Sequence, residues 1–239
     1  MKLTQYSVAV TGGSGGIGSA LISGLASEGA RVLNLDRIAP EKELPAEFIE
    51  TDLTNENSVQ DAFQKISAID AIIICAGIQL VGQDSKIGDL SLDTWQRTLD
   101  VNMTGAFLSV KYAIPKLIKS GNGSVVLIGS PTGMTMEGAG YTAYGASKAG
   151  MMGLSRIIAV DYKEVGIRSN VVVPGTMSTP LIKKIWDDPE KGPDLIRRTP
   201  LGRMGDPHDL VGIVNWLVSA ESSFATGASF AVDGGMTAR

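Results

Sequence analysis

Two residues of different acid–base character stand four positions apart in the segment YTAYGASKAG, residues 141–150. On a helix, this spacing places the phenol of Tyr144 and the amine of Lys148 on one face. A free tyrosine titrates near about pH 10 and is a poor base at neutral pH, but a nearby ammonium favours the phenolate. The pair therefore predicts a proton-transfer site in which Lys148 lowers the pKa of Tyr144. Tyr141 has Gly145 at the same offset, so we expect Tyr141 to precede the helix and face the substrate or the loop.

Ser130 ends the apolar run 124–130, which is typical of a buried strand. Ligands of open α/β sheets bind at the carboxyl ends of the strands, so Ser130 could hydrogen-bond a substrate oxygen and stabilise its developing charge. These residue types suit a reaction in which a base takes a proton from a substrate hydroxyl. Tyr144 and Lys148 also have an interpretation without chemistry. A tyrosine at a helix start often packs against apolar neighbours, and a lysine on a helix is often solvated.

A glycine-rich turn, TGGSGGIG at residues 11–18, lies between a predicted strand and a predicted helix. Backbone N–H groups at a helix N-terminus bind anions, and glycine lets a pyrophosphate approach closely. Asp36 ends the next predicted strand, 18 residues after Gly18. A carboxylate there can accept both ribose hydroxyls of NAD and repel the extra phosphate of NADP, although a turn-capping aspartate is the alternative. Arg37 could hold a phosphate, but the turn has no basic residue, so we predict NAD, with NADP as the alternative.

Apolar strands alternate with helical patterns along the whole chain, which predicts an α/β fold. We expect a single-domain Rossmann-type doubly wound parallel sheet over residues 1–239, with helices on both faces. Asp206 is predicted to cap the last helix. The irregular stretch 176–205 carries four prolines, and we expect it to cover the substrate. Strands are predicted at 6–10, 31–36, 48–52, 71–77, 124–130, 168–175 and 228–235, and helices at 17–29, 55–67, 92–100, 103–119, 144–164 and 206–219.

Composition excludes several classes of protein. The net charge is −4, from 21 basic and 25 acidic residues, and no basic run is present, so a nucleic-acid partner is not expected. A single cysteine, Cys75, excludes an internal disulfide and suits a reducing compartment. No apolar run reaches the roughly 18 residues of a membrane span, and the first apolar run is too short for a signal peptide. We predict a cytoplasmic protein without a metal site, and we expect the only histidine, His208, to lie on the surface.

The glycine turn and the tyrosine–lysine pair together resemble the classical-type short-chain dehydrogenase/reductases, with TGxxxGxG at residues 11–18 and YxxxK at residues 144–148. The similarity covers essentially the whole chain. The resemblance implies an NAD(P)-dependent alcohol dehydrogenase or carbonyl reductase, and a homotetramer built partly through the long helices on either side of strand 124–130. Further matches follow in order: TDL at 51–53, VNMTG at 101–105, IGS at 128–130, VVPG at 172–175, TP at 179–180 and VDGG at 232–235.

The resemblance also implies a role for each matching position. Asn102, Ser130, Tyr144 and Lys148 match the catalytic tetrad, in which Asn102 would hold a water that relays protons to Lys148. Lys148 would also donate to the nicotinamide ribose. The implied cofactor-binding residues are Gly12, Ser14, Gly16, Ile17, Gly18, Asp36, Arg37, Asp52, Leu53, Ala76, Gly77, Tyr144, Lys148, Pro174, Gly175 and Thr179.

Three departures from the family pattern stand out. Ile74 and Cys75 replace two asparagines that brace the neighbouring strand, and Pro131 follows Ser130 where a small residue is common. The segment 37–47 carries two prolines and leaves little room for a helix, so we expect the adenine end of the cofactor site to be more open than usual.

The substrate wall should come from residues 131–141 and 176–200, which are mainly apolar. This suits a secondary alcohol (a hydroxy compound, a polyol, or a cyclic or steroid-like molecule) and its ketone. One alternative is an NADPH-dependent 3-oxoacyl-acyl-carrier-protein reductase, although Lys163 and Arg168 form no arginine patch for an acidic carrier. Another is a dinucleotide-binding regulator without turnover, against which the complete tetrad argues. The predicted substrate-binding residues are Ser130, Thr132, Met136, Tyr141, Met177 and Trp186.

Overall fold

A computed structural model describes residues 2–135 and 139–238 of the protein. Within these residues, seven parallel strands form one sheet in the order β3-β2-β1-β4-β5-β6-β7. The chain order reverses between β1 and β4, which is the arrangement of a doubly wound sheet and confirms the predicted fold class. The strands are β1 (Ser7–Thr11), β2 (Arg31–Asp36), β3 (Glu47–Glu50), β4 (Ala71–Ile74), β5 (Ser124–Ile128), β6 (Arg168–Pro174) and β7 (Ser229–Val232).

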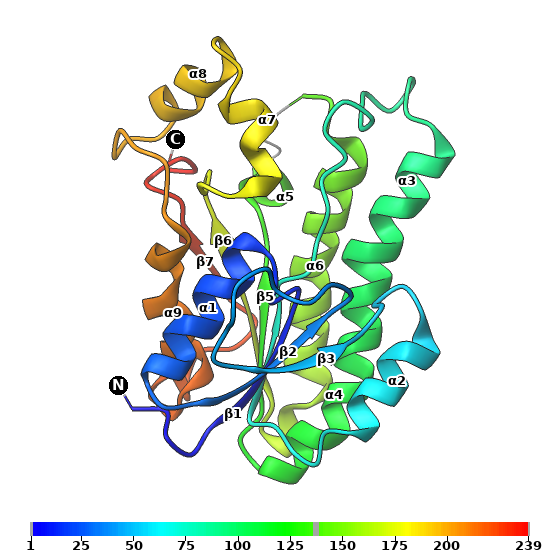
Figure 1. Ribbon diagram of the computed structural model, residues 1–239, viewed down its shortest axis with the longest axis vertical. Coiled ribbons are helices and arrows are strands. Elements are labelled where there is room, and N and C mark those ends of the chain that lie inside the picture. The colour runs from blue at the N-terminus through cyan, green and yellow to red at the C-terminus, as the bar shows by residue number, and fades with distance from the viewer. Residues whose placement is uncertain (1, 136–138, 239) are drawn as a thin grey trace.

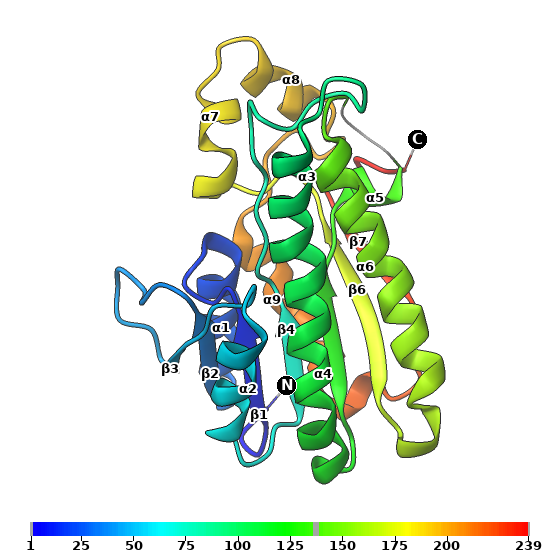
Figure 2. The same cartoon turned by 90° about the vertical axis from the view of Figure 1, so that its right-hand side faces the viewer.

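Helices cover both faces of the sheet (Figure 1). One layer holds α1 (Gly16–Ser27) and α9 (Val211–Val218), and the opposite layer holds α2 (Glu56–Gln64), α4 (Gly105–Ser120) and α6 (Thr142–Asp161). Figure 2 looks onto this second layer, with the sheet behind it. Successive strand residues point to opposite faces, so β1 contributes to two apolar cores. Its residues 8 and 10 pack on the side of α1 and α9, and its residue 9 packs on the other side.

The helices predicted at 92–100 and 103–119 form one continuous helical run. α3 (Leu92–Leu99) passes through a single π-helical turn at Asp100–Thr104 into α4. Turns of this kind are rare and occur often at functional sites. This one holds Asn102, which is fully buried.

Several helix boundaries differ from the predictions. α1 and α2 end at Ser27 and Gln64, two and three residues before their predicted ends. The last helix begins as a 3₁₀ turn, Pro207–Leu210, before α9. The predicted cap is confirmed, because the Asp206 side chain accepts the N–H of His208 while Asp209 accepts the N–H of Asp206. α6 begins two residues earlier than predicted and ends at Asp161, and a 3₁₀ turn at Lys163–Val165 follows it. Tyr141 precedes α6, as predicted.

The stretch 176–205 is only partly irregular. It holds a 3₁₀ turn (Pro180–Ile182) and two short helices, α7 (Lys183–Trp186) and α8 (Lys191–Arg197), which lie above the carboxyl ends of the strands (Figure 1). The segment 37–46 contains no helix, in line with its two prolines. No helix in the described ranges is long and apolar enough to cross a membrane.

Candidate active site

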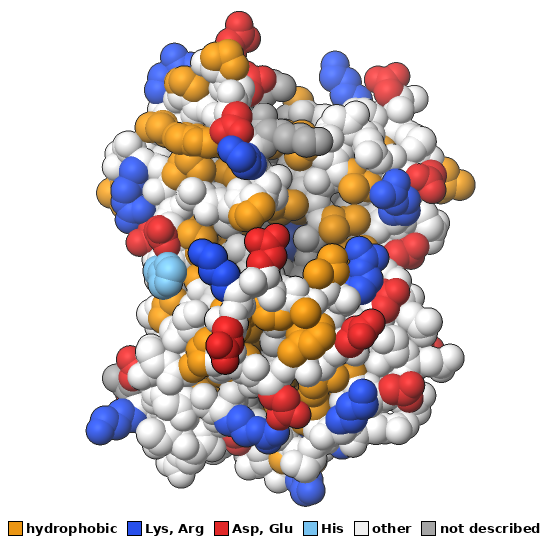
Figure 3. Space-filling model, in the orientation of Figure 1, with side chains coloured by type: hydrophobic (Ala, Val, Ile, Leu, Met, Phe, Trp, Pro, Cys, Tyr) orange, Lys and Arg blue, Asp and Glu red, His pale blue; other side chains and the backbone are white. Residues whose placement is uncertain are grey.

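A cavity of about 390 Å³ lies at the carboxyl ends of the central strands, below α7 and α8. Figure 3 shows this face of the molecule hollowed at its centre, beneath the cover. Ser130, Tyr144 and Lys148 line the cavity together with Gly77 and Thr179. The fold thus brings together residues that are up to about a hundred positions apart in the sequence, at the edge where open α/β sheets bind ligands.

The glycine turn at the start of α1 is shaped for an anionic group. Gly12 has a φ of +66°, and a Cβ atom there would lie 2.6 Å from the Cα of Ala76, so only glycine fits this close crossing. The N-cap residue of α1, Gly15, offers no side chain to the first helical turn. The backbone N–H groups there remain suited to a phosphate, so these residues fit the pyrophosphate of a dinucleotide.

Asp36 stands beside this turn with its carboxylate fixed in orientation. One of its oxygens accepts the N–H of Ser14 at 3.0 Å and the other accepts the N–H of Ile38 at 3.1 Å. Carboxylate oxygens have further lone pairs, so the group can still accept ribose hydroxyls. Asn34, which the sequence reading missed, supports the turn from β2 by donating to Ser14 Oγ at 3.1 Å.

The residues predicted to surround the adenine include a carboxylate with a lowered pKa, that of Asp52. Hydrogen bonds from Thr54 hold the pKa of Asp52 below its usual value, and the charge of Arg37 adds to this lowering. Arg37 is exposed. Leu53 is buried against Gly105, where a Cβ atom would lie 3.1 Å from that of Leu53.

Tyr144 and Lys148 share the inner face of α6, as their spacing predicts. The Lys148 side chain is only 4% exposed, and its Nζ lies 5.8 Å from the centre of the Tyr144 ring. Nζ donates to the carbonyl oxygen of Ile128 at 2.8 Å. The strand predicted to end at Ser130 ends at Ile128, and Ser130 instead caps a short helix, α5 (Pro131–Met134). From this position Ser130 lies within hydrogen-bonding reach of the Tyr144 hydroxyl. The phenol, hydroxyl and ammonium therefore meet at the cavity.

The predicted lowering of the Tyr144 pKa by Lys148 is wrong for the protein chain by itself. Burial raises the pKa of Tyr144, and the hydrogen bond from Ser130 opposes this rise only in part. The ammonium of Lys148 interacts with the Ile128 carbonyl, and burial lowers the pKa of Lys148 itself to about 8. At neutral pH the chain alone thus presents a protonated phenol.

Asn102 links three parts of the site. Its amide oxygen accepts the N–H of Ile78 at 2.8 Å, and its amide nitrogen donates to the Ile78 carbonyl and to Ser147 Oγ, both at 3.0 Å. Ser147 in turn donates to the Tyr144 carbonyl at 2.7 Å. The side chain thus joins the segment after β4 to α6, and its role in a proton relay remains a prediction.

Thr11 supplies a brace where the family's two asparagines are missing. Its hydroxyl oxygen accepts the N–H groups of Cys75 and Ala76 at 3.2 and 3.4 Å, which ties the end of β4 to β1. Cys75 lines the cavity, and burial raises the pKa of its thiol to about 12. A thiol with this pKa is protonated at neutral pH and is a poor nucleophile.

The predicted substrate wall is only partly assembled. Thr132, Tyr141 and Met177 line the cavity, as do Pro174 and Gly175 from the predicted cofactor segment. Trp186 is not among the lining residues and is 41% exposed, whereas Ile185, the residue before it in α7, lines the cavity. Met136 falls outside the described residues. Lining residues that the sequence reading did not single out for this wall include Gln79, Asp194, Leu195, Arg198 and Met236.

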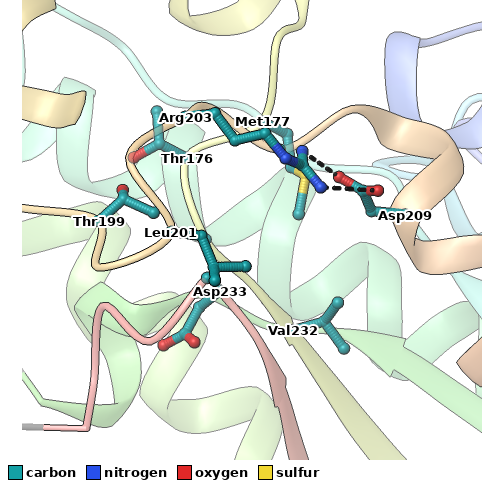
Figure 4. Close-up of a pocket in the computed structure, with 11 residues that line it drawn as sticks. Thr176, Met177, Thr199, Leu201, Arg203, Asp209, Val232 and Asp233 are labelled. Carbon is teal, nitrogen blue, oxygen red and sulfur yellow. Dashed lines mark hydrogen bonds and ion pairs between the residues drawn. The ribbon is translucent and has the colours of Figure 1, made fainter.

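A smaller cavity of about 240 Å³ lies beside the first, and the two share residues 175–177 as a wall. Figure 4 shows Arg203 and Asp209 facing each other at its rim, joined by N–O distances of 2.7 and 3.2 Å. Gly205 makes backbone hydrogen bonds with residues 176 and 178, each 2.9 Å long. These bonds join the two ends of the covering stretch 176–205 next to the Arg203–Asp209 pair. Among the described residues, no group of three or more His, Cys, Asp or Glu side chains is arranged to hold a metal ion.

Comparisons with known proteins agree with this geometry. A family model described as enoyl-(acyl carrier protein) reductase matches residues 12–237. The 2-(S)-hydroxypropyl-CoM dehydrogenase 3 of Xanthobacter autotrophicus is 34% identical over 99% of this chain and 98% of its own. The 3-oxoacyl-acyl-carrier-protein reductase FabG of Thermotoga maritima is 32% identical, with 99% of each chain covered.

A solved structure, a gluconate 5-dehydrogenase from Burkholderia cenocepacia J2315 in complex with NADP and tartrate, superposes with a TM-score of 0.91 at 28% identity. The match covers 100% of this chain and 97% of that one. Fold, site geometry and sequence similarity lead to one conclusion. The chain belongs to the short-chain dehydrogenase/reductase family, of the classical type, whose members bind a nicotinamide dinucleotide.

Proposed function

We propose that the protein is an NAD(H)-dependent oxidoreductase that interconverts a secondary alcohol and its ketone. The observation that carries this proposal is the meeting of Ser130, Tyr144 and Lys148 on one cavity wall, next to a glycine turn that fits a pyrophosphate. A binding protein without turnover would not need a buried ammonium next to a phenol that lines the cavity, because burying a charged group costs free energy. This argues against a non-catalytic regulator.

The roles of the side chains follow from their positions. The bound nicotinamide accepts or supplies the hydride. Ser130 Oγ hydrogen-bonds the substrate oxygen and stabilises the charge that develops on it. The Tyr144 hydroxyl gives a proton to that oxygen during ketone reduction and, as phenolate, takes it back during alcohol oxidation. Lys148, whose ammonium donates to the carbonyl oxygen of Ile128, would hold the ribose of the cofactor.

NAD is the cofactor that we propose, because the Asp36 carboxylate accepts the N–H of Ser14 in the glycine turn, and there it would accept ribose hydroxyls and repel a 2′-phosphate. The exposed guanidinium of Arg37 is the feature that favours NADP, and the gluconate 5-dehydrogenase relative binds NADP. Arg37 already acts on Asp52, so its charge is partly balanced.

For the substrate, we propose a hydroxy compound, polyol or cyclic alcohol of small to medium size. The relatives' own names include a hydroxypropyl-CoM dehydrogenase and a gluconate dehydrogenase. The cavity combines apolar residues with a few polar ones, which suits such molecules.

A 3-oxoacyl-acyl-carrier-protein reductase is the second candidate, and the FabG relative favours it. Such an enzyme needs basic residues for an acidic carrier. Arg168, however, donates inward to the carbonyl oxygens of Leu217 and Ser219 and to Ser222 Oγ, and is half-buried. Lys163 is exposed beside the acidic Glu164. The chain's own contacts therefore favour a small alcohol.

A panel of secondary alcohols and 3-oxoacyl thioesters, assayed with NAD(H) and NADP(H) by nicotinamide absorbance, tests the proposal. We expect turnover with an alcohol, a lower Kd for NADH than for NADPH, and a loss of about a thousandfold in kcat for Tyr144→Phe. Turnover confined to thioesters with NADPH would favour the second candidate. Near-full activity of a folded Tyr144→Phe variant would contradict the assignment of the site.

A further inference from the structure

The helix that carries the catalytic tyrosine has no cap of its own. Tyr141 occupies the N-cap position of α6, where its side chain makes no capping hydrogen bond, and the first turn contains no acidic residue. The first backbone N–H groups of a helix have no partner within it, and a buried helix start needs acceptors from elsewhere. Here the second and third helical residues are Ala143 and Tyr144.

Asp84 supplies these acceptors from the segment that follows β4. One carboxylate oxygen accepts the N–H of Ala143 at 3.1 Å and the other accepts that of Tyr144 at 2.9 Å, across 59 and 60 positions of sequence. The first oxygen also accepts the N–H of Ser85 at 3.0 Å. Asp84 is only 9% exposed. A buried carboxylate held by backbone N–H groups at a helix N-terminus is a strong, charge-assisted cap.

This cap joins the catalytic helix to one wall of the cavity. Asp84 closes a compact turn in which its own N–H donates to the carbonyl oxygen of Leu80 at 2.8 Å. The residues just before this turn are Gln79, which lines the cavity, and Ile78, which Asn102 holds by two hydrogen bonds. Segment 78–84 is therefore attached at both ends to elements that carry the tetrad.

The position of the Tyr144 backbone decides where its hydroxyl stands. Only two side-chain torsions separate the Cα atom from the rigid phenol ring, so a shift of the helix start moves the hydroxyl relative to Ser130 and the substrate. A misplacement of about 1 Å in a reacting group can cost about a hundredfold in rate. The cap on residues 143 and 144 acts at the turn where this matters most.

We propose that Asp84 is a positioning residue for the reaction. Its carboxylate holds the first turn of α6, and with it the Tyr144 phenol, at a fixed position relative to the cavity wall at Gln79. The inference rests on the proposed function, since the reaction supplies the rate that the cap controls.

The test compares two caps of similar chemistry at different distances from the site. Asn55 caps α2 by accepting the N–H groups of Asn57 and Ser58, so Asn55→Ala removes a matched pair of hydrogen bonds. Both Asp84→Ala and Asn55→Ala should lower Tm, by about 2 to 4 °C. At saturating cofactor, we expect Asp84→Ala to lower kcat tenfold or more, as about 0.5 Å of misplacement would, with the Kd for NADH unchanged, whereas Asn55→Ala keeps kcat.

Asp84→Asn keeps one acceptor oxygen, and we expect its kcat to lie between those of the wild type and Asp84→Ala. If Asp84→Ala does not fold, Asp84→Asn decides in its place. A fall in kcat that is no larger than that of Asn55→Ala would overturn the inference.

Titration of the Tyr144 phenol gives a second readout that needs no turnover. The ultraviolet titration of each protein, minus that of its Tyr144→Phe counterpart, isolates this one phenol. We expect Asp84→Ala to lower the pKa of Tyr144, because a loosened first turn admits water and weakens the desolvation that raises this pKa. An unchanged pKa would count against the inference. If the wild type turns over no substrate, the proposed function fails, and this titration still decides the role of Asp84.

Discussion

At the scale of single residues, the chemistry of the site could be predicted and its electrostatics could not. The spacing of Tyr144 and Lys148 fixes a shared helix face, and the structure places both at the cavity. Whether the pKa of Tyr144 is raised or lowered depends on the burial of the phenol and on where Nζ of Lys148 points. Neither follows from the spacing of the two residues. The capping role of Asp84 could not be predicted from the sequence either, because the N–H groups that it accepts lie about sixty positions away.

The buried ammonium of Lys148 makes stability depend on pH. Burial lowers its pKa to about 8 from the usual 10.5. Below about pH 8 the group is charged in both the folded and unfolded states, and folding bears the full cost of burying the charge. Between these two pKa values the unfolded chain binds more protons, so the free energy of unfolding rises with pH.

We therefore expect Lys148→Met to be inactive but more stable than the wild type at neutral pH, by about 2 kcal/mol after allowing for the lost hydrogen bond to Ile128. The difference should shrink toward pH 10. Urea unfolding of both proteins at several pH values measures it, with Lys119→Met, at an exposed position of α4, as the control. A difference that stays constant with pH would show that the ammonium bears no such cost.

At the scale of elements, the strand and helix order followed from hydrophobic periodicity, but the special turns did not. The pattern 92–119 reads as two helices because a π-helical turn at Asp100–Thr104 shifts the helical phase between them. That shift is part of the site, since Asn102 lies within it. The stretch 176–205 reads as irregular because its prolines interrupt any long period, yet it folds into two short helices.

The base of this covering segment yields a prediction. Arg203 donates to both carboxylate oxygens of Asp209 and to the carbonyl oxygen of Met204 (Figure 4). The pair is half-exposed, so its loss should cost little stability. Arg203→Ala should instead loosen the cover and raise KM for the alcohol about threefold to tenfold, with kcat nearly unchanged.

Steady-state kinetics of Arg203→Ala measure this effect. Arg31→Ala, which removes an exposed ion pair with Glu47 between β2 and β3, is the matched control. Equal KM values for the two variants would contradict a role of Arg203 in holding the cover.

At the scale of the whole molecule, one layer leaves apolar side chains exposed on neighbouring helices. Phe107 and Ile118 on α4 are 51% and 42% exposed, and Ile157 and Val160 on α6 are 58% and 66% exposed. Both helices belong to the same layer of the fold (Figure 2). Apolar side chains gathered in this way typically mark a protein–protein interface, and the homotetramer that we predict would cover them.

Light scattering tests the assembly. We expect the wild type to have a mass near four times the 25.0 kDa of one chain. Glutamate at Phe107 and Ile157 together should lower that mass, because a buried interface cannot accommodate unpaired carboxylates. Ile87→Glu, at an exposed position in the loop before α3, should leave the mass unchanged. A wild-type mass of a single chain would mean that these side chains stay in contact with water and that the site works without a partner copy.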